Sequence, residues 1–158
     1  MAAHDLLSRF PVNTDVARLV GIRNIFNSTL ARIDSRQQKL ELQWGETLLE
    51  MPYRSGYEPG QSIIWCIPSD GIVVHRRNRP SRGEHENPVF GVVDEVFQFG
   101  QTTELTIVVD DPDAHPLHCS VPTHVAMRND LGVGADIGVS IKADMIHIMA
   151  SATGDQPG

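Results

Sequence analysis

An internal repeat constrains the fold of this chain more than any other feature of its sequence. Residues 60–72 align with residues 134–146 at a constant separation (134 − 60 = 74). Upstream, residues 24–30 align with residues 87–93 at a shorter separation (87 − 24 = 63). The difference between the two separations (74 − 63 = 11) predicts insertions in the second copy, around residues 110–116 and the helix that follows them. A repeat of this length predicts two copies of one small structural unit.

Each copy consists mostly of short apolar or alternating runs that are separated by glycine, proline and aspartate. Such runs predict β-strands bounded by turns. The predicted strands are residues 28–33, 39–44, 47–51, 62–67 and 71–75 in the first copy, and residues 90–97, 104–109, 117–121, 137–141 and 145–149 in the second. Closure is how small sheets avoid exposed edges, so five strands per copy predict an all-β chain of two small barrels.

Two helices and a polar linker complete the predicted organisation. Residues 13–20 and residues 123–131 carry helix start and stop signals. The linker between the copies is charged and contains proline. The predicted domains are a junction helix at 1–21, a first barrel at 22–76, the linker at 77–87, a second barrel at 88–150 and a disordered tail at 151–158.

Charge and motif content exclude several classes of function. The formal net charge of −7 argues against binding to nucleic acid or to an anionic membrane through bulk charge. Cys66 and Cys119 form no disulfide framework, and the sequence shows neither a secretory signal nor a membrane-spanning run, so we expect a cytoplasmic protein. The P-loop and the G-x-S-x-G, H-E-x-x-H and C-x-x-C motifs are all missing from the sequence. We therefore expect a binding protein rather than an enzyme.

Histidine and cysteine lie close together at residues 115–119, where a metal site is one interpretation. His115, His118 and Cys119 are zinc-ligand types. Adjacent residues of an extended strand point to opposite faces, however, so His118 and Cys119 are a poor chelating pair. Surface histidines scattered on a strand are the favoured interpretation.

A second group of polar residues has the chemistry of an oxyanion site. Hydroxyl and N–H donors, joined by one or two cations, bind tetrahedral oxyanions. On the residues alone, ordinary polar loop positions are the more common explanation. The candidates are Arg23, Asn24, Ser28, Thr29, Ser69, Ser140 and Lys142.

Three stretches resemble one family. Residues 10–26 resemble the P-x-x-x-x-V-A-x-x-x-G-x-x-N junction that leads into the C-terminal domain of ABC importer ATPases. Residues 60–72 fall where many importers have G-x-x-V-x-x-x-I-R-P-E-D-I. Residues 131–149 are similar to the end of molbindin-type TOBE repeats, L-x-x-G-x-x-V-x-x-x-I-K-A-[ST]-x-V. The resemblance covers about residues 8–149 and implies two OB-like five-stranded barrels behind a short N-terminal helix.

The resemblance also implies a function. The resemblance implies that the chain is the regulatory, dimerising C-terminal domain of an importer ATPase that handles molybdate, tungstate or sulfate. Its partners would be a second copy, the ATP-binding domain and, through that domain, the permease at the inner face of the membrane. No cofactor is implied, and molybdate or tungstate is the implied ligand.

The chain departs from the family pattern at three places. Ile67-Pro68-Ser69 replaces the usual Arg-Pro-Glu, and Asp144 replaces the Ser or Thr near the anion. The second copy begins with Glu86-Asn87, where the first has Arg23-Asn24. A carboxylate at position 144 repels an anion unless it points away or pairs with Lys142.

Three alternatives therefore stay open. The first is a free-standing molbindin-like protein, and the second is a ligand-free structural domain of a sugar, polyamine or iron importer ATPase. The third, single-strand nucleic-acid binding, is disfavoured because aromatic residues are few and the net charge is acidic.

Overall fold

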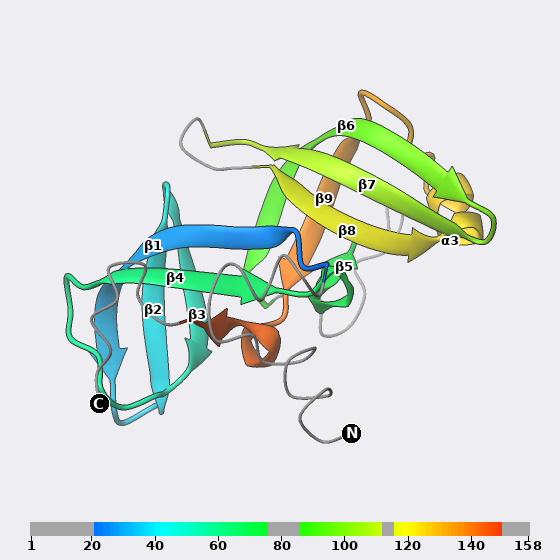
Figure 1. Ribbon diagram of the computed structural model, residues 1–158. Helices are drawn as coiled ribbons and strands as arrows, with labels where there is room; N and C mark the ends of the chain where they lie inside the picture. Colours follow the sequence, from blue (N-terminus) through cyan, green and yellow to red (C-terminus); the bar gives the residue numbers. More distant parts are fainter. Residues whose placement is uncertain (1–20, 76–85, 112–115, 150–158) are drawn as a thin grey trace, which may run out of the picture. The chain divides into compact units, whose positions relative to one another are not determined.

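The computed structural model describes residues 21–75, 86–111 and 116–149, which fold into two compact units (Figure 1). Unit 1 contains the chain up to Trp44, Leu48–Pro68 and the chain from Ala143 onward, and unit 2 contains Gly45–Thr47 and Ser69–Lys142. Each unit is built around one five-stranded antiparallel sheet, which confirms the predicted all-β, OB-like fold class. The junction helix, nearly all of the linker and the tail lie outside the described residues. No helix in the described ranges is long and apolar enough to cross a membrane.

Unit 1 is built from the first four strands of the first copy and the last short strand of the second copy. In β1, alternate residues are buried from Asn24 to Leu30, as expected for a strand with one face on a core. Gly45 has φ 59° at the tight turn between β2 and β3. The sheet order is β10-β4-β1-β2-β3, with β1 at Asn24–Asp34, β2 at Lys39–Trp44, β3 at Thr47–Pro52, β4 at Ser62–Ile67 and β10 at His147–Ile148.

Three aromatic rings fill the core of unit 1. The ring centroid of Phe26 lies 4.9 Å from that of Trp44 and 5.0 Å from that of Trp65. The two indoles meet edge to face at 5.9 Å. All three side chains are buried, and these tilted geometries are the arrangements that aromatic quadrupoles favour.

Unit 2 has the same sheet plan and one short helix. The helix α3 (Thr123–Arg128) ends three residues before the predicted end at Leu131. Asn129 donates its side-chain amide to the carbonyl of Val125, and Asp130 has φ 52°, a left-handed conformation that a helix cannot continue through. The sheet order is β5-β9-β6-β7-β8, with β5 at Ile72–Val74, β6 at Pro88–Phe99, β7 at Thr102–Val109, β8 at Leu117–Pro122 and β9 at Asp136–Ile141.

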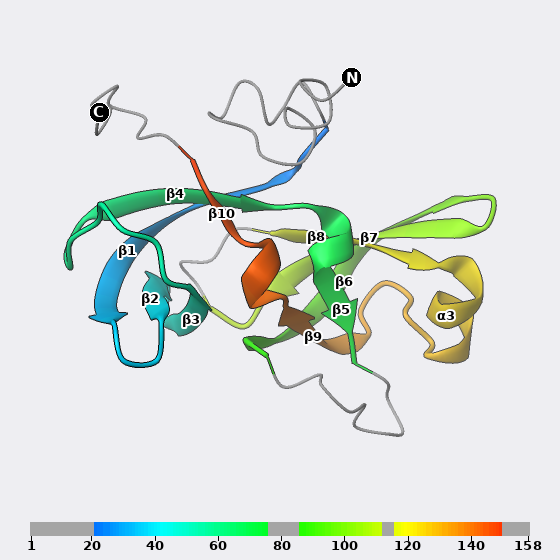
Figure 2. The same ribbon diagram turned by 90° about the horizontal axis from the view of Figure 1, so that it is seen from below.

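The two copies exchange their last strands. The strand β5 follows the first copy but pairs with β9 in unit 2, and β10 ends the second copy but pairs with β4 in unit 1 (Figures 1 and 2). The repeat itself is visible in detail, because the bulge between Leu30 and Arg32 recurs 63 positions later between Val93 and Glu95. The boundaries predicted at 22–76 and 88–150 therefore do not coincide with the compact units.

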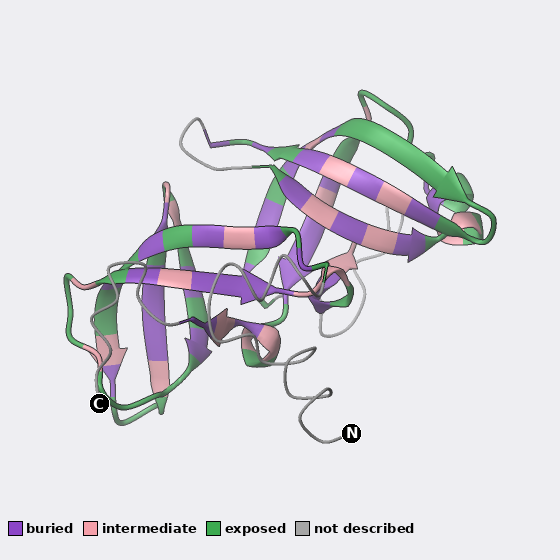
Figure 3. Ribbon diagram, viewed as in Figure 1, coloured by how far each residue is buried: buried purple, intermediate pink, exposed green. Residues whose placement is uncertain are grey.

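Burial alternates along β3, β7 and β8, whereas β2, β4 and β9 each bury three residues in a row, and the end of β6 is exposed on both faces (Figure 3). Gly91, in the first half of β6, is buried and meets the backbone of β7. A Cβ atom at Gly91 would clash with the carbonyl oxygen of Val108, which belongs to the backbone and cannot rotate away.

We expect Gly91→Ala to destabilise unit 2 by about 1–3 kcal/mol through overpacking. The matched control is Gly132→Ala, because a Cβ atom at Gly132 meets nothing within 4 Å. The free energies of unfolding of both variants in urea check this prediction. Equal stability of the two variants would contradict it.

Both cysteines are buried in strands. Burial raises the pKa of the Cys66 thiol to about 11, and burial together with Glu104 raises the pKa of Cys119 to about 12. Since the thiolate is the reactive form, we expect iodoacetamide to label neither thiol at pH 8 in the folded protein. Mass spectrometry before and after denaturation checks this, with two labels expected only after denaturation. Rapid labelling of the folded protein would contradict the burial.

Candidate oxyanion site

The repeat creates two equivalent corners, where the first strand of each copy begins beside the last residue of its fourth strand. Corner 1, in unit 1, contains Arg23, Asn24, Ile67 and Pro68, and Asn24 pairs with Ile67. Corner 2, in unit 2, contains Glu86, Asn87, Ile141 and Lys142. In corner 2 the backbone N–H of Ile141 donates to the carbonyl of Asn87 at 3.2 Å. The two corners contain three of the predicted site residues, Arg23, Asn24 and Lys142.

The asparagine of each corner has a structural role. Asn24 is completely buried, and Asn87 is buried with φ 43°. The side-chain amide of Asn87 donates to the carbonyl of Ile141 at 3.1 Å. Asparagine tolerates a left-handed backbone, and its side chain forms hydrogen bonds with nearby backbone groups. It can therefore hold the start of one strand against the neighbouring strand. At corner 1 the exposed charged group is therefore the neighbouring Arg23.

The corners differ in charge. Corner 1 has exposed Arg23 where corner 2 has exposed Glu86, and it has Pro68 where corner 2 has exposed Lys142. Corner 1 thus carries one cation, whereas corner 2 carries a cation and a carboxylate. Since a carboxylate disfavours a bound anion, Coulomb energy favours corner 1 as an anion site.

The two units differ in charge in the same direction as their corners. The described part of unit 2 holds ten carboxylates and, as lysine or arginine, only Arg128 and Lys142. The described part of unit 1 holds five Asp or Glu side chains and five Lys or Arg side chains. The surroundings of corner 1 therefore oppose an anion less than those of corner 2.

The structure separates the two predicted hydroxyls of unit 1. Ser28 faces the core, where its Oγ accepts a hydrogen bond from Nε1 of Trp65 at 2.8 Å. Thr29 is exposed, because the next residue of a strand points to the opposite face. These two side chains are not brought together.

The predicted hydroxyls of unit 2 have partners within that unit. The Oγ of Ser140 is 2.8 Å from Nε2 of His75, and Ser140 is 2% exposed. Ser120 Oγ donates its single proton to Glu104 at 2.6 Å, and Ser69 Oγ lies 3.4 Å from Ser120 Oγ. The sequence did not identify His75 or Ser120 as site residues, because the fold brings them to these serines from positions 65 and 51 residues away in the chain.

Lys142 lies at the turn after β9. Its side chain is exposed, and its backbone N–H donates to the carbonyl of Gly71 at 2.9 Å. Asp144 is also exposed, in the short 3₁₀ turn Ala143–Met145. Because Arg23 belongs to unit 1 and Lys142 to unit 2, a site that both residues share stays a prediction.

The zinc-type residues of β8 point in different directions. Cys119 is buried in the core, whereas His118 faces outward, with Nδ1 3.3 Å from Oγ1 of Thr106. His115 lies outside the described residues. The described ranges contain no group of three or more His, Cys, Asp or Glu side chains placed to hold a metal.

Comparison with known proteins rests on structure. No family model matches the sequence, and no curated protein matches it. A similar solved structure is that of ModG, described as a cytoplasmic molybdate-binding protein and crystallised with molybdate bound. The TM-score is 0.68 at 15% sequence identity, and the match covers 83% of this chain and 98% of the ModG chain. The likeness shows that the two chains share a fold.

Proposed function

We propose that this chain binds a tetrahedral oxyanion of the molybdate or tungstate class, and that corner 1 is its primary site. The observation that carries the proposal is the exposed Arg23 beside the buried Asn24, at the corner that contains no carboxylate. The guanidinium group can donate two parallel hydrogen bonds to an oxyanion. The shared fold with molybdate-bound ModG supports the ligand class. The role of the chain is then binding, without catalysis.

Replacement of Arg23 tests this site. We expect Arg23→Ala to weaken tungstate binding about 10- to 100-fold, because a charged hydrogen bond contributes roughly 1.5–3 kcal/mol. Calorimetry with tungstate, molybdate and sulfate measures the affinities of the full chain. The matched control is Arg54→Ala, which removes another exposed arginine of unit 1 and should leave the affinity unchanged. Equal affinity of the Arg23→Ala variant and the unmodified chain would exclude corner 1.

The Lys142→Ala variant tests whether the second cation belongs to the same site. A loss comparable to that of Arg23→Ala supports the prediction that Arg23 and Lys142 contact the same anion. Unchanged binding confines the site to corner 1. Asp144→Ser adds a third comparison, because tighter binding would mean that this carboxylate faces the anion.

The role within a transporter is a second candidate, supported by the resemblance of residues 10–26 to an importer ATPase junction. On this proposal the chain pairs with a second copy and regulates an ATP-binding domain at the inner face of the membrane. The free-standing molbindin-like alternative is supported by the match to almost the whole ModG chain. A P-loop in the same reading frame upstream would favour the transporter role. Sedimentation of the purified chain at micromolar concentration tests the expected homodimer.

A further inference from the structure

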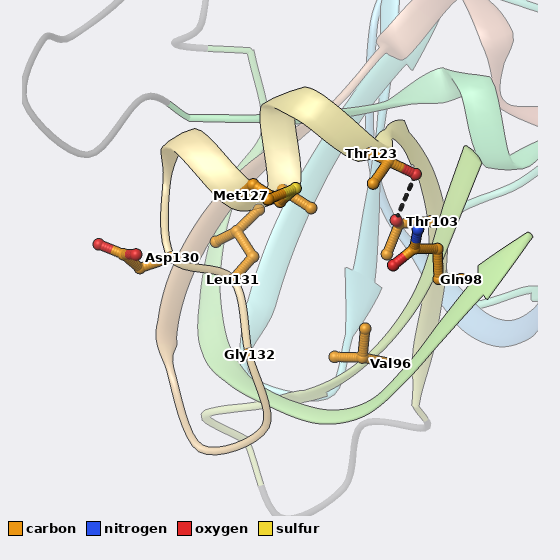
Figure 4. Close-up of a pocket in the computed structure, with 9 residues that line it drawn as sticks. Val96, Gln98, Thr103, Thr123, Met127, Asp130, Leu131 and Gly132 are labelled. Atoms are coloured by element: carbon orange, nitrogen blue, oxygen red, sulfur yellow. Dashed lines mark hydrogen bonds between the residues drawn. The ribbon is translucent and has the colours of Figure 1, made fainter. Parts of the chain in front are cut away.

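An open groove lies in unit 2 between the end of the β6–β7 hairpin and α3 (Figure 4). Its volume is about 490 Å³. The side chains of Val96 and Met127 border it from the strand and from the helix, and a hydrogen bond of 2.9 Å joins Thr103 Oγ1 to Thr123 Oγ1 at its polar end (Figure 4). The groove is lined by Val96, Gln98, Thr103, Thr123, Ala126, Met127, Asp130, Leu131 and Gly132.

The apolar side chains around this groove are unusually exposed. Met127 is 73% exposed, and Val133, just beyond the groove, is 72% exposed. On the other face of β6, Phe97 and Phe99 are 58% and 66% exposed, with ring centroids 4.6 Å apart. Phe97 and Phe99 do not line the groove, so the end of this hairpin exposes large apolar side chains on both faces of β6, and such exposure marks an interaction surface.

The fold itself does not require these aromatic residues. The positions of the first copy that lie 63 residues before Phe97 and Phe99 are Asp34 and Arg36, at the end of the equivalent strand and in its turn. The same architecture thus carries charged residues at one hairpin and phenylalanines at the other. The exposed phenylalanine pair is therefore a property of the second copy.

The charge around the groove indicates which kind of partner it can bind. Asp94 and Glu95 are exposed where the exposed part of β6 begins, and the carboxylate of Asp130 points outward from the rim (Figure 4). Among the described residues, Asp130 is the only charged one that lines the groove, and the described part of unit 2 around it holds ten carboxylates against two cations, Arg128 and Lys142. A negative rim attracts a basic partner and repels nucleic acid, an anionic membrane and a second copy of the same acidic unit.

We propose that this groove binds a basic amphipathic segment of a partner protein. In a helical segment, apolar residues at positions i, i+3, i+4 and i+7 would enter the groove, and flanking Lys or Arg would meet Asp94, Glu95 and Asp130. The basic stretch 76–82 of this chain is a poor occupant, because its only apolar residue is Pro80. The open form of the groove favours a peptide over a small ligand, which needs most of its surface enclosed. This proposal is independent of oxyanion binding.

The test is selection of peptides from a random displayed library on the full chain, followed by affinity measurement with the synthetic peptides. We expect the selected peptides to combine apolar residues at helical spacing with a net positive charge. Met127→Glu should weaken their binding at least about tenfold, as for a central interface residue. The matched control is Leu48→Glu in unit 1, which also places a carboxylate at an exposed apolar position and should leave the affinity unchanged. Circular dichroism establishes that both variants fold.

A charge reversal sharpens the test. Asp130→Lys should weaken the binding of the basic peptides. Peptides in which Glu replaces the flanking Lys should restore the affinity of this variant. The proposal is overturned if no peptide is enriched, if the enriched peptides are acidic or uncharged, or if Met127→Glu leaves their affinity intact. It is also overturned if a photocrosslinker at position 127 captures residues 1–20 or a second copy in place of the added peptide.

Discussion

A chain that ends at Lys142 is expected to lose the folded state of unit 1. This truncation removes β10, the edge strand that pairs with β4, and with it the buried side chains of Ile146, Ile148 and Met149. Burial of each such side chain stabilises a fold by about 1.5–3 kcal/mol, so the expected loss is roughly 5 kcal/mol. That is as large as the whole stability of many small domains.

Tryptophan fluorescence measures this result directly, because Trp44 and Trp65 are both in the core of unit 1. We expect emission at longer wavelength and loss of the cooperative unfolding transition. The matched control ends at Ala150, which retains β10 and should show the emission and unfolding midpoint of the full chain. Unchanged fluorescence in the chain that ends at Lys142 would contradict the strand exchange.

The strands of this fold could be predicted from sequence, but the exchange between the copies could not. The run 62–67 coincides with β4, since its apolar residues and flanking turn signals act locally. The run 145–149 became a 3₁₀ turn followed by a strand of two residues, His147–Ile148. The constant separation of 74 shows which segments are equivalent. This separation does not show which sheet the last strand of each copy joins, because tertiary packing determines the pairing partners.

The residue types of the candidate site could be predicted from sequence, but most of their partners in the structure could not. Alternation along β1 was sufficient to place Ser28 and Thr29 on opposite faces, and this signal was present in the sequence. The pairing of Ser140 with His75 had no such signal, since the two residues are far apart in the chain. The groove was missed for another reason. Strand periodicity describes Val96 as a strand residue but does not show that Met127 of the helix α3 lines the same groove.

Replacement of Trp65 by alanine is expected to destabilise unit 1 by about 3–5 kcal/mol, the cost of removing a large aromatic ring from a core. Part of this cost is polar, because Nε1 of Trp65 donates a buried hydrogen bond to Ser28. The equivalent positions in the second copy are Val139 and Gly91, so that core has no counterpart of this bond. Urea unfolding followed by circular dichroism measures the loss. A cost below about 1 kcal/mol would contradict the role of this ring in the core.

The two tryptophans provide the control that separates packing from hydrogen bonding. Among the described residues, the buried Nε1 of Trp44 has no hydrogen-bond partner. Trp44→Phe should therefore cost only packing, whereas Trp65→Phe should cost a comparable amount of packing and also leave Ser28 Oγ without its donor, an additional loss of about 1–3 kcal/mol. In a double-mutant cycle, Ser28→Ala should cost much less in the Trp65→Phe background than in the unmodified chain. Strictly additive costs would mean that the hydrogen bond contributes nothing, and that packing alone distinguishes the two indoles.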